Sequence, residues 1–330
     1  MFEVATMTNP DFISFRPPAH GRSGTGDAEQ LEAHISALRT VDYRCGGGMC
    51  REAVMVRIHW GHELLGMATA GPVPDRLLSA VADLHNLAGW TCFDSGNVGA
   101  ADHHFDIALQ LAKQGNNDEL AANIHYRKGR LRLHHGSPDA ALTHFQLGQL
   151  AAHKSGSRLA ASILHANQAW AYAKKGAAEP ALGLLARAAD DFGHADVSQP
   201  PDWARFFTET ELSALVGTVH TELACTVDKQ HSRVAIPALT EAIKGYGPDM
   251  ARSRSFCLIM LATDHMLAGD VEQGVAVGIQ AVSAAETLKS VRVKDRIRPL
   301  ERQTDKHRDN ADAHALSDCI TTFITSPTHT

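Results

Sequence analysis

The chain repeats one pattern three times at a step of 40 residues: His85-Asn86-Leu87-Ala88-Gly89, His125-Tyr126-Arg127-Lys128-Gly129 and His165-Ala166-Asn167-Gln168-Ala169. Each copy is followed, at fixed distances, by a turn glycine, a small residue and a large apolar residue. These are Gly96, Ala101 and Phe105 in the first copy, Gly136, Ala141 and Phe145 in the second, and Gly176, Ala181 and Leu185 in the third. Small residues let a partner helix approach closely, and glycine can close a helix in a left-handed turn. Because one helical hairpin cannot bury its apolar stripe alone, the pattern predicts a stack of hairpins.

The predicted fold is an all-α, tetratricopeptide-like solenoid of helical hairpins, wound as a right-handed superhelix. The order of small, glycine, aromatic and small residues is that of the tetratricopeptide repeat, whose period is about 34 residues. Histidine replaces the usual opening tryptophan, and the longer period implies extended helices or loops. The predicted units are a disordered leader (1–27), a divergent N-terminal hairpin (28–71), three matched repeats (72–193), two divergent repeats (194–288), and a basic closing helix with a tail (289–330).

Charge and cysteine usage restrict the partners and the compartment. The 330 residues carry a formal net charge of −6, which offers no general field for nucleic acid or for an anionic membrane. The sequence shows no charged-then-apolar leader and no apolar run near about 18 residues. Its 6 cysteines are scattered rather than arrayed as a disulfide framework. We therefore expect a cytoplasmic protein with reduced thiols that binds neither nucleic acid nor membrane directly.

Residues on the first helix of each hairpin are expected to line the concave groove of the solenoid. The residue after each repeated histidine, and those four and eight positions later, should face inward. These positions give Asn86, Trp90, Asp94, Tyr126, Arg130, His134, Trp170 and Lys174. Aromatic faces with a few charged groups suit a small molecule, a peptide or a protein segment, and Arg130 could contact a carboxylate or phosphate. The alternative is that these residues only pack between repeats or face solvent.

The 20 histidines allow a second interpretation, a metal site. The candidate ligands are His59 and His62, three apart on a predicted helix, Cys45 and Cys50, which flank three glycines, and the repeated His85, His125 and His165. Imidazoles at equivalent places on successive helices could share zinc, iron or copper. That would make the chain a metal-dependent enzyme or a metal sensor. The preferred interpretation is that these residues pack or are solvated, with no cofactor.

Several segments, within and outside the repeat, resemble one family. They are Asp42-Tyr43-Arg44-Cys45-Gly46-Gly47-Gly48, Leu87-Ala88-Gly89-Trp90 with Asp94-Ser95-Gly96, Pro201-Asp202-Trp203, and Ser290-Val291-Arg292-Val293-Lys294-Asp295-Arg296-Ile297. From roughly residue 29 to residue 322 the chain resembles the tetratricopeptide sensor regions of actinobacterial transcriptional regulators of the Cro/xenobiotic-response type. The resemblance implies regulation, often near secondary-metabolite or developmental genes, through a ligand or partner bound by the solenoid. About 28 residues precede the first predicted helix, too few for the helix-turn-helix domain of that family, so this domain was lost or trimmed and DNA binding is not expected here.

These observations predict a regulatory protein that holds its ligand in the groove, and they favour a binding protein over an enzyme. The main contacts are expected to be Trp90, Tyr126, Arg130 and Trp170. A homodimer is compatible with the pattern. The basic segment 289–308, with eight Lys and Arg against three acidic residues, is expected to form a solvated face or a partner contact because it lacks interleaved aromatic residues.

Overall fold

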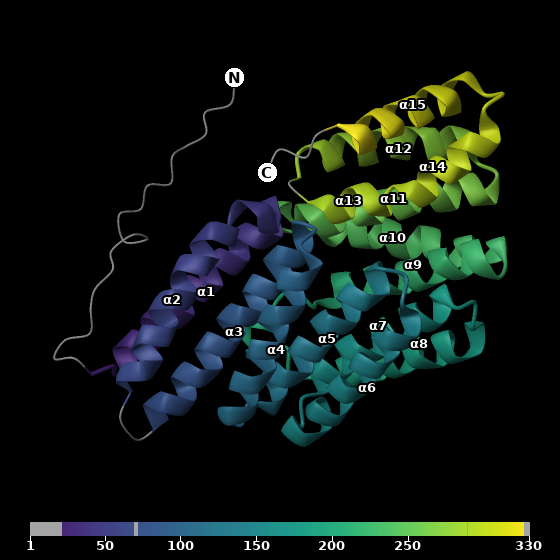
Figure 1. The fold of residues 1–330 in the computed structure, drawn as a ribbon. Coiled ribbons are helices and arrows are strands. Elements are labelled where there is room, and N and C mark those ends of the chain that lie inside the picture. Colours follow the sequence, from purple (N-terminus) through teal and green to yellow (C-terminus); the bar gives the residue numbers. More distant parts are fainter. Residues whose placement is uncertain (1–21, 69–71, 289, 327–330) are drawn as a thin grey trace.

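The computed structural model describes residues 22–68, 72–288 and 290–326. Within these ranges the chain is α-helical with short 3-10 turns and contains no strand (Figure 1). The first described helix begins at Thr25, two residues before the predicted end of the leader. Residues 1–21 of that predicted leader lie outside the described residues. The prediction of an all-helical chain is thus confirmed for the part that the structure describes.

The helices follow one another through short turns. Their bounds are α1 (Thr25–Cys45), α2 (Arg51–Met67), α3 (Pro72–Asp94), α4 (Val98–Gln114), α5 (Asp118–His134), α6 (Pro138–Ser155), α7 (Arg158–Lys174), α8 (Ala178–Gly193), α9 (Glu209–Thr226), α10 (Ser232–Gly245), α11 (Ala251–Ala268), α12 (Val271–Glu286), α13 (Val291–Arg296), α14 (Arg298–Thr304) and α15 (Ala311–Thr325). The 3-10 turns are η3 (Gly47–Met49), η4 (Asp202–Ala204), η5 (Lys229–His231), η6 (Pro248–Met250) and η7 (Asp305–His307).

Consecutive helices pack as adjacent pairs, as expected of a helical repeat solenoid. The pairs are α3 with α4, α5 with α6, α7 with α8, α9 with α10, and α11 with α12. The turns within the three matched repeats contain Gly96, Gly136 and Gly176, whose φ angles are +81°, +72° and +70°. These are left-handed conformations that favour glycine, so the predicted role of the three turn glycines is confirmed.

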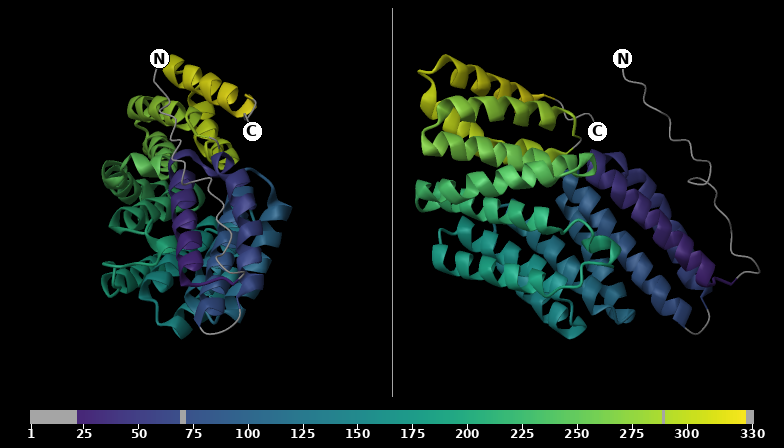
Figure 2. Two further views of the ribbon diagram at one scale, coloured as in Figure 1. Left: turned by 90° about the vertical axis from the view of Figure 1, so that its left-hand side faces the viewer. Right: turned by 180° about the vertical axis from the view of Figure 1, so that it is seen from behind.

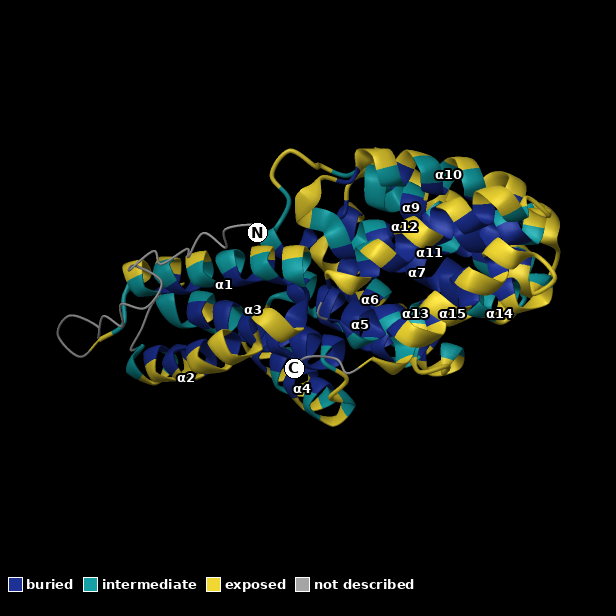
Figure 3. Ribbon diagram, turned by 90° about the horizontal axis from the view of Figure 1, so that it is seen from above, coloured by how far each residue is buried: buried dark blue, intermediate teal, exposed yellow. Residues whose placement is uncertain are grey.

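The repeated small residue makes room for the aromatic residue of the partner helix. A Cβ atom added to Gly89 would lie 2.6 Å from Phe105 Cε1, and one added to Gly129 would lie 2.2 Å from Phe145 Cε1. In the third repeat the corresponding pair is Ala169 and Leu185, both buried. In the hairpins of the three matched repeats, the first helices, such as α5 and α7, are buried nearly all round (Figure 3). The second helices, α4, α6 and α8, bury one face only.

Both ends of the described chain depart from the simple stack. Helices α1 and α2 each pack on α3, and α13 and α14 pack on α11 while α15 packs on α12. The C-terminal end of α1 also contacts α11, so the N-terminal helices meet the C-terminal part of the stack at one end (Figures 1 and 2). The concave side of the described chain is therefore not one open groove but holds cavities that α13 partly covers. Among the described helices, none has the length and apolarity needed to cross a membrane.

Candidate functional site

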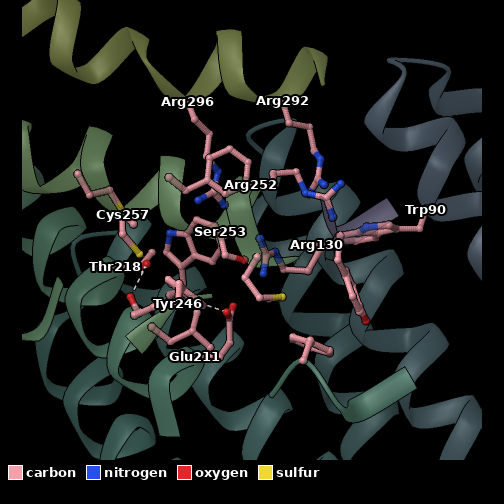
Figure 4. Close-up of a pocket in the computed structure, with 18 of the residues that line it drawn as sticks. Trp90, Arg130, Glu211, Thr218, Tyr246, Arg252, Ser253, Cys257, Arg292 and Arg296 are labelled. Atoms are coloured by element: carbon pink, nitrogen blue, oxygen red, sulfur yellow. Dashed lines mark hydrogen bonds between the residues drawn. The ribbon is translucent and has the colours of Figure 1, made fainter. Parts of the chain in front are cut away.

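Two adjoining cavities lie inside the solenoid, between the first helices of the hairpins and α13. The first cavity has a volume of about 70 Å³ and the second about 190 Å³. Figure 4 shows the first cavity, with Arg292 and Arg296 projecting into it from α13. The residues that line both cavities are Arg130, Trp170, Phe256, Met260, Arg292 and Arg296. These six residues mark the junction of the two cavities and come from α5, α7, α11 and α13.

Cations outnumber carboxylates around the first cavity. Its lining contains five arginines and one carboxylate, which are Arg127, Arg130, Arg252, Arg292, Arg296 and Glu211. The Glu211 carboxylate accepts a hydrogen bond from the hydroxyl of Tyr246 (Figure 4). Burial raises the pKa of Glu211, although the Tyr246 hydroxyl and Arg130 act in the opposite direction. A single engaged carboxylate therefore faces five guanidinium groups.

Arg292 is the most deeply buried cation at the junction. Its side chain is 4% exposed, and its Nε donates to Asp94 Oδ1 over 2.6 Å. Its Nη2 is buried and has no hydrogen-bond partner among the described residues. The guanidinium carbon lies 4.5 Å from the ring centroid of Trp90 and 4.7 Å from that of Phe93. Burial lowers the pKa of Arg292 to about 10, with Asp94 opposing the shift, so the group stays charged at neutral pH.

Arg296 is held by aromatic faces alone. Its guanidinium carbon lies 4.4 Å from the ring centroids of both Trp170 and Phe256. Within the part of the chain that the structure describes, it makes no hydrogen bond and no ion pair. Burial, together with the charges of Arg130 and Arg292, lowers the pKa of Arg296 to about 9. The cation is therefore retained at neutral pH in a place where its neighbours repel it.

Arg130 completes the group of guanidinium side chains at the junction. Its guanidinium carbon lies 4.5 Å from the Trp170 ring centroid. Its Nη1 lies 3.4 Å from the Tyr126 hydroxyl and 3.3 Å from Asn167 Oδ1, both long for hydrogen bonds. The three arginines Arg130, Arg292 and Arg296, here called the arginine triad, thus stack on aromatic rings and bond weakly or incompletely to protein acceptors.

Asp94 connects helices that are far apart in the sequence, and it does not line either cavity. Its carboxylate accepts hydrogen bonds from the Gly47 amide at 2.7 Å and the Ser290 hydroxyl at 2.7 Å. It also pairs with Arg252 at 3.1 Å and with Arg292 at 2.6 Å. Burial alone raises the pKa of Asp94, but Arg252 and Arg292 outweigh it and hold the pKa well below its ordinary value. The expectation that Asp94 faces the ligand is corrected: it holds α13 and α11 to α3.

The structure brings six of the eight predicted groove residues to the cavities. Trp90, Tyr126, Arg130 and Trp170 line the first cavity, and Arg130, His134, Trp170 and Lys174 line the second. Asn86, like Asp94, does not line either cavity. Its amide nitrogen donates to Asn123 Oδ1 over 2.8 Å, because its side chain is buried between α3 and α5.

Sequence reasoning missed the contributions of α9, α11 and α13. The expectation that the basic segment 289–308 forms a solvated face or a partner contact is wrong for Arg292 and Arg296, which enter the cavities. The sequence did contain a pattern that indicates this position. Arg292 and Arg296 are four residues apart and so share a helix face, and each is followed directly by a buried apolar residue, Val293 or Ile297.

The predicted metal ligands do not converge on one point. Each repeated histidine faces the second helix of its own hairpin instead of the next repeated histidine. His85 Nδ1 lies 3.0 Å from His104 Nδ1, and His165 Nδ1 lies 2.8 Å from Asp191 Oδ2. The ring centroids of His125 and His144 are 5.9 Å apart.

Of the other candidates, His62 does meet a repeated histidine, since its Nε2 lies 2.9 Å from His85 Nε2. His59 is exposed and pairs with Glu63 at 3.3 Å. Cys50 is buried with its Sγ 3.7 Å from the carbonyl oxygen of Gly47, and Cys45 is half-buried. Across residues 22–68, 72–288 and 290–326 there is no group of three or more His, Cys, Asp or Glu side chains that could hold a metal ion.

Comparison with known proteins gives no relative from which a function could be transferred. No model of a known protein family matches the chain, and a search of curated proteins finds no match.

Proposed function

We propose that this protein is a tetratricopeptide-type regulatory protein of the cytoplasm that binds a small molecule in its interior cavities. The observation that carries this proposal is a partly covered space beside which two buried polar atoms lack partners. The Tyr43 hydroxyl and Arg292 Nη2 are both buried without a hydrogen-bond partner among the described residues, and both residues line the first cavity. Buried polar groups are normally bonded, so a bound molecule accounts for both atoms.

The size of the cavities favours a small molecule over a peptide or a protein segment. A water molecule occupies about 10–15 Å³ of such a cavity, so 190 Å³ gives room for on the order of a dozen water-sized groups. The helix α13 covers this space and itself supplies Arg292 and Arg296. A protein segment would need an open groove, whereas a metabolite can be enclosed.

Regulation follows if the ligand changes how α13 packs. A ligand shifts a conformational equilibrium only by its difference in affinity between two states. A molecule that contacts Arg292 and Arg296 binds only when α13 is docked, so it favours the closed arrangement. The outer surface formed by α13, α14 and α15 would then report occupancy to a partner. The resemblance to sensor regions of transcriptional regulators supports this role.

The test compares ligand binding by the wild-type protein with binding by a variant in which a larger side chain fills the cavity. Wild-type protein is screened by thermal shift against small molecules of every charge type, because a ligand specific to the native state raises the melting temperature. We expect at least one compound to raise it, and Met260→Trp, which fills the junction, to abolish the effect. Met55→Trp, at an exposed position on α2, is the matched control. Equal shifts in wild type and Met260→Trp would place binding elsewhere and reject the proposal.

A further inference from the structure

We infer that the ligand is a small organic anion, whose carboxylate or phosphate group is bound by the arginine triad and whose flat apolar part lies against the aromatic rings. This inference rests on the proposed function and adds the chemical class of the ligand. It is carried by the charges, the hydrogen bonds and the stacking at the junction of the two cavities.

The first step is the charge balance of the second cavity. Its lining contains four arginines, one lysine and two carboxylates, which are Arg130, Arg292, Arg296, Arg302, Lys174, Glu222 and Asp295. Both carboxylates are already engaged. Glu222 pairs with Lys174 at 2.8 Å, and Asp295 bonds to His134 Nε2 at 3.0 Å. Among the described residues, no carboxylate therefore forms an ion pair with Arg130 or Arg296, and Arg292 pairs with Asp94 on one side only.

The second step is the direction in which donors remain free. The Arg296 guanidinium carbon lies over two aromatic rings, 4.4 Å from the ring centroids of Trp170 and Phe256. Contact with these rings uses the charge of the group without supplying an oxygen acceptor, so the N–H donors of Arg296 still lack one among the described residues. Planar N–H pairs match the two oxygens of a carboxylate or of a phosphate. Arg292 Nη2 is such a donor, buried and without a partner among the described residues.

The third step is energetic. Like charges that are partly removed from water repel one another, and a buried charge without a counter-ion is costly. Burial and the neighbouring cations act together on Arg296, which lowers its pKa while leaving the charge in place. An anion between the three groups would relieve this repulsion and satisfy donors at the same time. A neutral ligand could satisfy donors through an oxygen atom but would leave the repulsion in place, and a cationic ligand would increase it.

The fourth step is the apolar part of the ligand. Trp170, Phe256 and Met260 line both cavities, and Phe93 and Ile259 line the second. Flat apolar groups stack on such rings with ring centroids about 4.5–7 Å apart. The volume of the second cavity admits a single ring system with a short acidic side chain better than a long chain.

The experiment compares acids with their neutral isosteres. Indole-3-acetate and indole-3-acetamide form the carboxylate pair, and phenyl phosphate with phenol forms the phosphate pair, all measured by calorimetry and thermal shift at constant ionic strength. We expect one of the acids to bind at least about tenfold more tightly than its neutral partner. The pair that shows the difference identifies the acidic group as carboxylate or phosphate.

Variants locate the charge effect. Arg296→Gln and Arg130→Gln should each weaken acid binding by about tenfold or more and leave the neutral compounds unchanged. Arg296→Lys should recover part of the affinity because it keeps the charge. Arg298→Gln is the matched control, because Arg298 is exposed, lies two residues from Arg296 and does not line either cavity. Arg130→Gln gives the same test from α5 if the α13 variant does not fold.

The outcomes separate this inference from the proposed function. Neutral compounds that bind as tightly as their acids, or acid binding that survives both Gln variants, would overturn the anion while leaving a ligand site in place. Acid binding that is lost in Met260→Trp as well as in the Gln variants would support both. The absence of binding by every compound of every charge would reject the proposed function and this inference with it.

Discussion

Asp94 Oδ1 on α3 accepts a hydrogen bond of 2.6 Å from Nε of Arg292 on α13, a residue 198 positions later in the chain. The same carboxylate bonds to Ser290 and pairs with Arg252, so one buried side chain joins α3, α11 and the segment that covers the cavities. Its second oxygen also accepts from the amide of Gly47 in η3. A single buried carboxylate therefore connects three distant segments and fixes one side of Arg292.

Replacing that carboxylate tests the closure. Asp94→Asn should lower the free energy of unfolding by about 3–5 kcal/mol, because it leaves the buried Arg292 with an uncharged partner and removes one of the two carboxylates, Asp42 and Asp94, that pair with Arg252. Urea denaturation measures the change. The comparison is Asp249→Asn, which removes the exposed pair with Arg44 and should cost no more than about 1 kcal/mol. Similar losses of unfolding free energy in both variants would show that the buried Asp94 network stabilises the protein no more than an exposed ion pair does.

The ligand-free protein should become more stable when the uncompensated cation is removed. Arg296→Met replaces a half-buried charge with an apolar side chain, and we expect the free energy of unfolding to rise by about 1 kcal/mol, since the lost stacking offsets part of the gain. Arg298→Met, at the exposed position, should change it little. A large decrease for Arg296→Met would mean that this arginine is a structural residue.

Acid should destabilise the protein through its buried histidines. Burial, with His104 and His62 next, lowers the pKa of His85 to about 3, and burial with His144 and Lys128 lowers that of His125 to about 4. At pH values between these folded-state pKa values and the ordinary histidine pKa of about 6.5, the unfolded chain binds protons that the folded chain does not. The stability contributed by each neutral histidine is therefore present above pH about 6.5 and is lost as the pH falls toward the folded pKa.

The measurement is unfolding of wild type and His125→Gln at pH values from 7.5 to 4.5. The difference in unfolding free energy should move in favour of the variant by up to about 1.4 kcal/mol for each pH unit below about 6.5. Because both proteins share every other titrating group, that difference isolates His125. A constant difference across the range would show that His125 titrates normally.

Ligand binding should slow amide hydrogen exchange in the covering segment. If an acid such as indole-3-acetate binds, exchange in residues 291–296 should slow more than exchange in α2, which lies far from the cavities. Mass spectrometry of deuterated peptides measures both. Equal protection of the two segments would indicate a general stabilisation and not docking of α13.

The repeat was predictable because its determinants are local. Gly129 and Phe145 must fit together within one hairpin, and Gly136 must turn the chain between them, so a short window of sequence specifies each unit. The inward direction of Tyr126, Arg130 and Trp170 follows from the same helical period.

The rest depends on contacts between distant parts of the chain. Asp94 has the spacing of a groove residue, yet it lies at the end of α3, where Arg252 and Arg292 reach it. Nothing within 40 residues of Asp94 shows that α13 will dock there. The alternative metal hypothesis required the repeated histidines to face one another across repeats, but His85 meets His104 of its own hairpin instead.

The order of synthesis gives the Asp94 network a further consequence. A ribosome produces α3 long before α11 and α13, so the carboxylate must stay hydrated while the early hairpins assemble. Stacked hairpins normally need only their neighbours to fold. Here the nascent repeats can stack, but the two cavities form only after α13 has emerged from the ribosome.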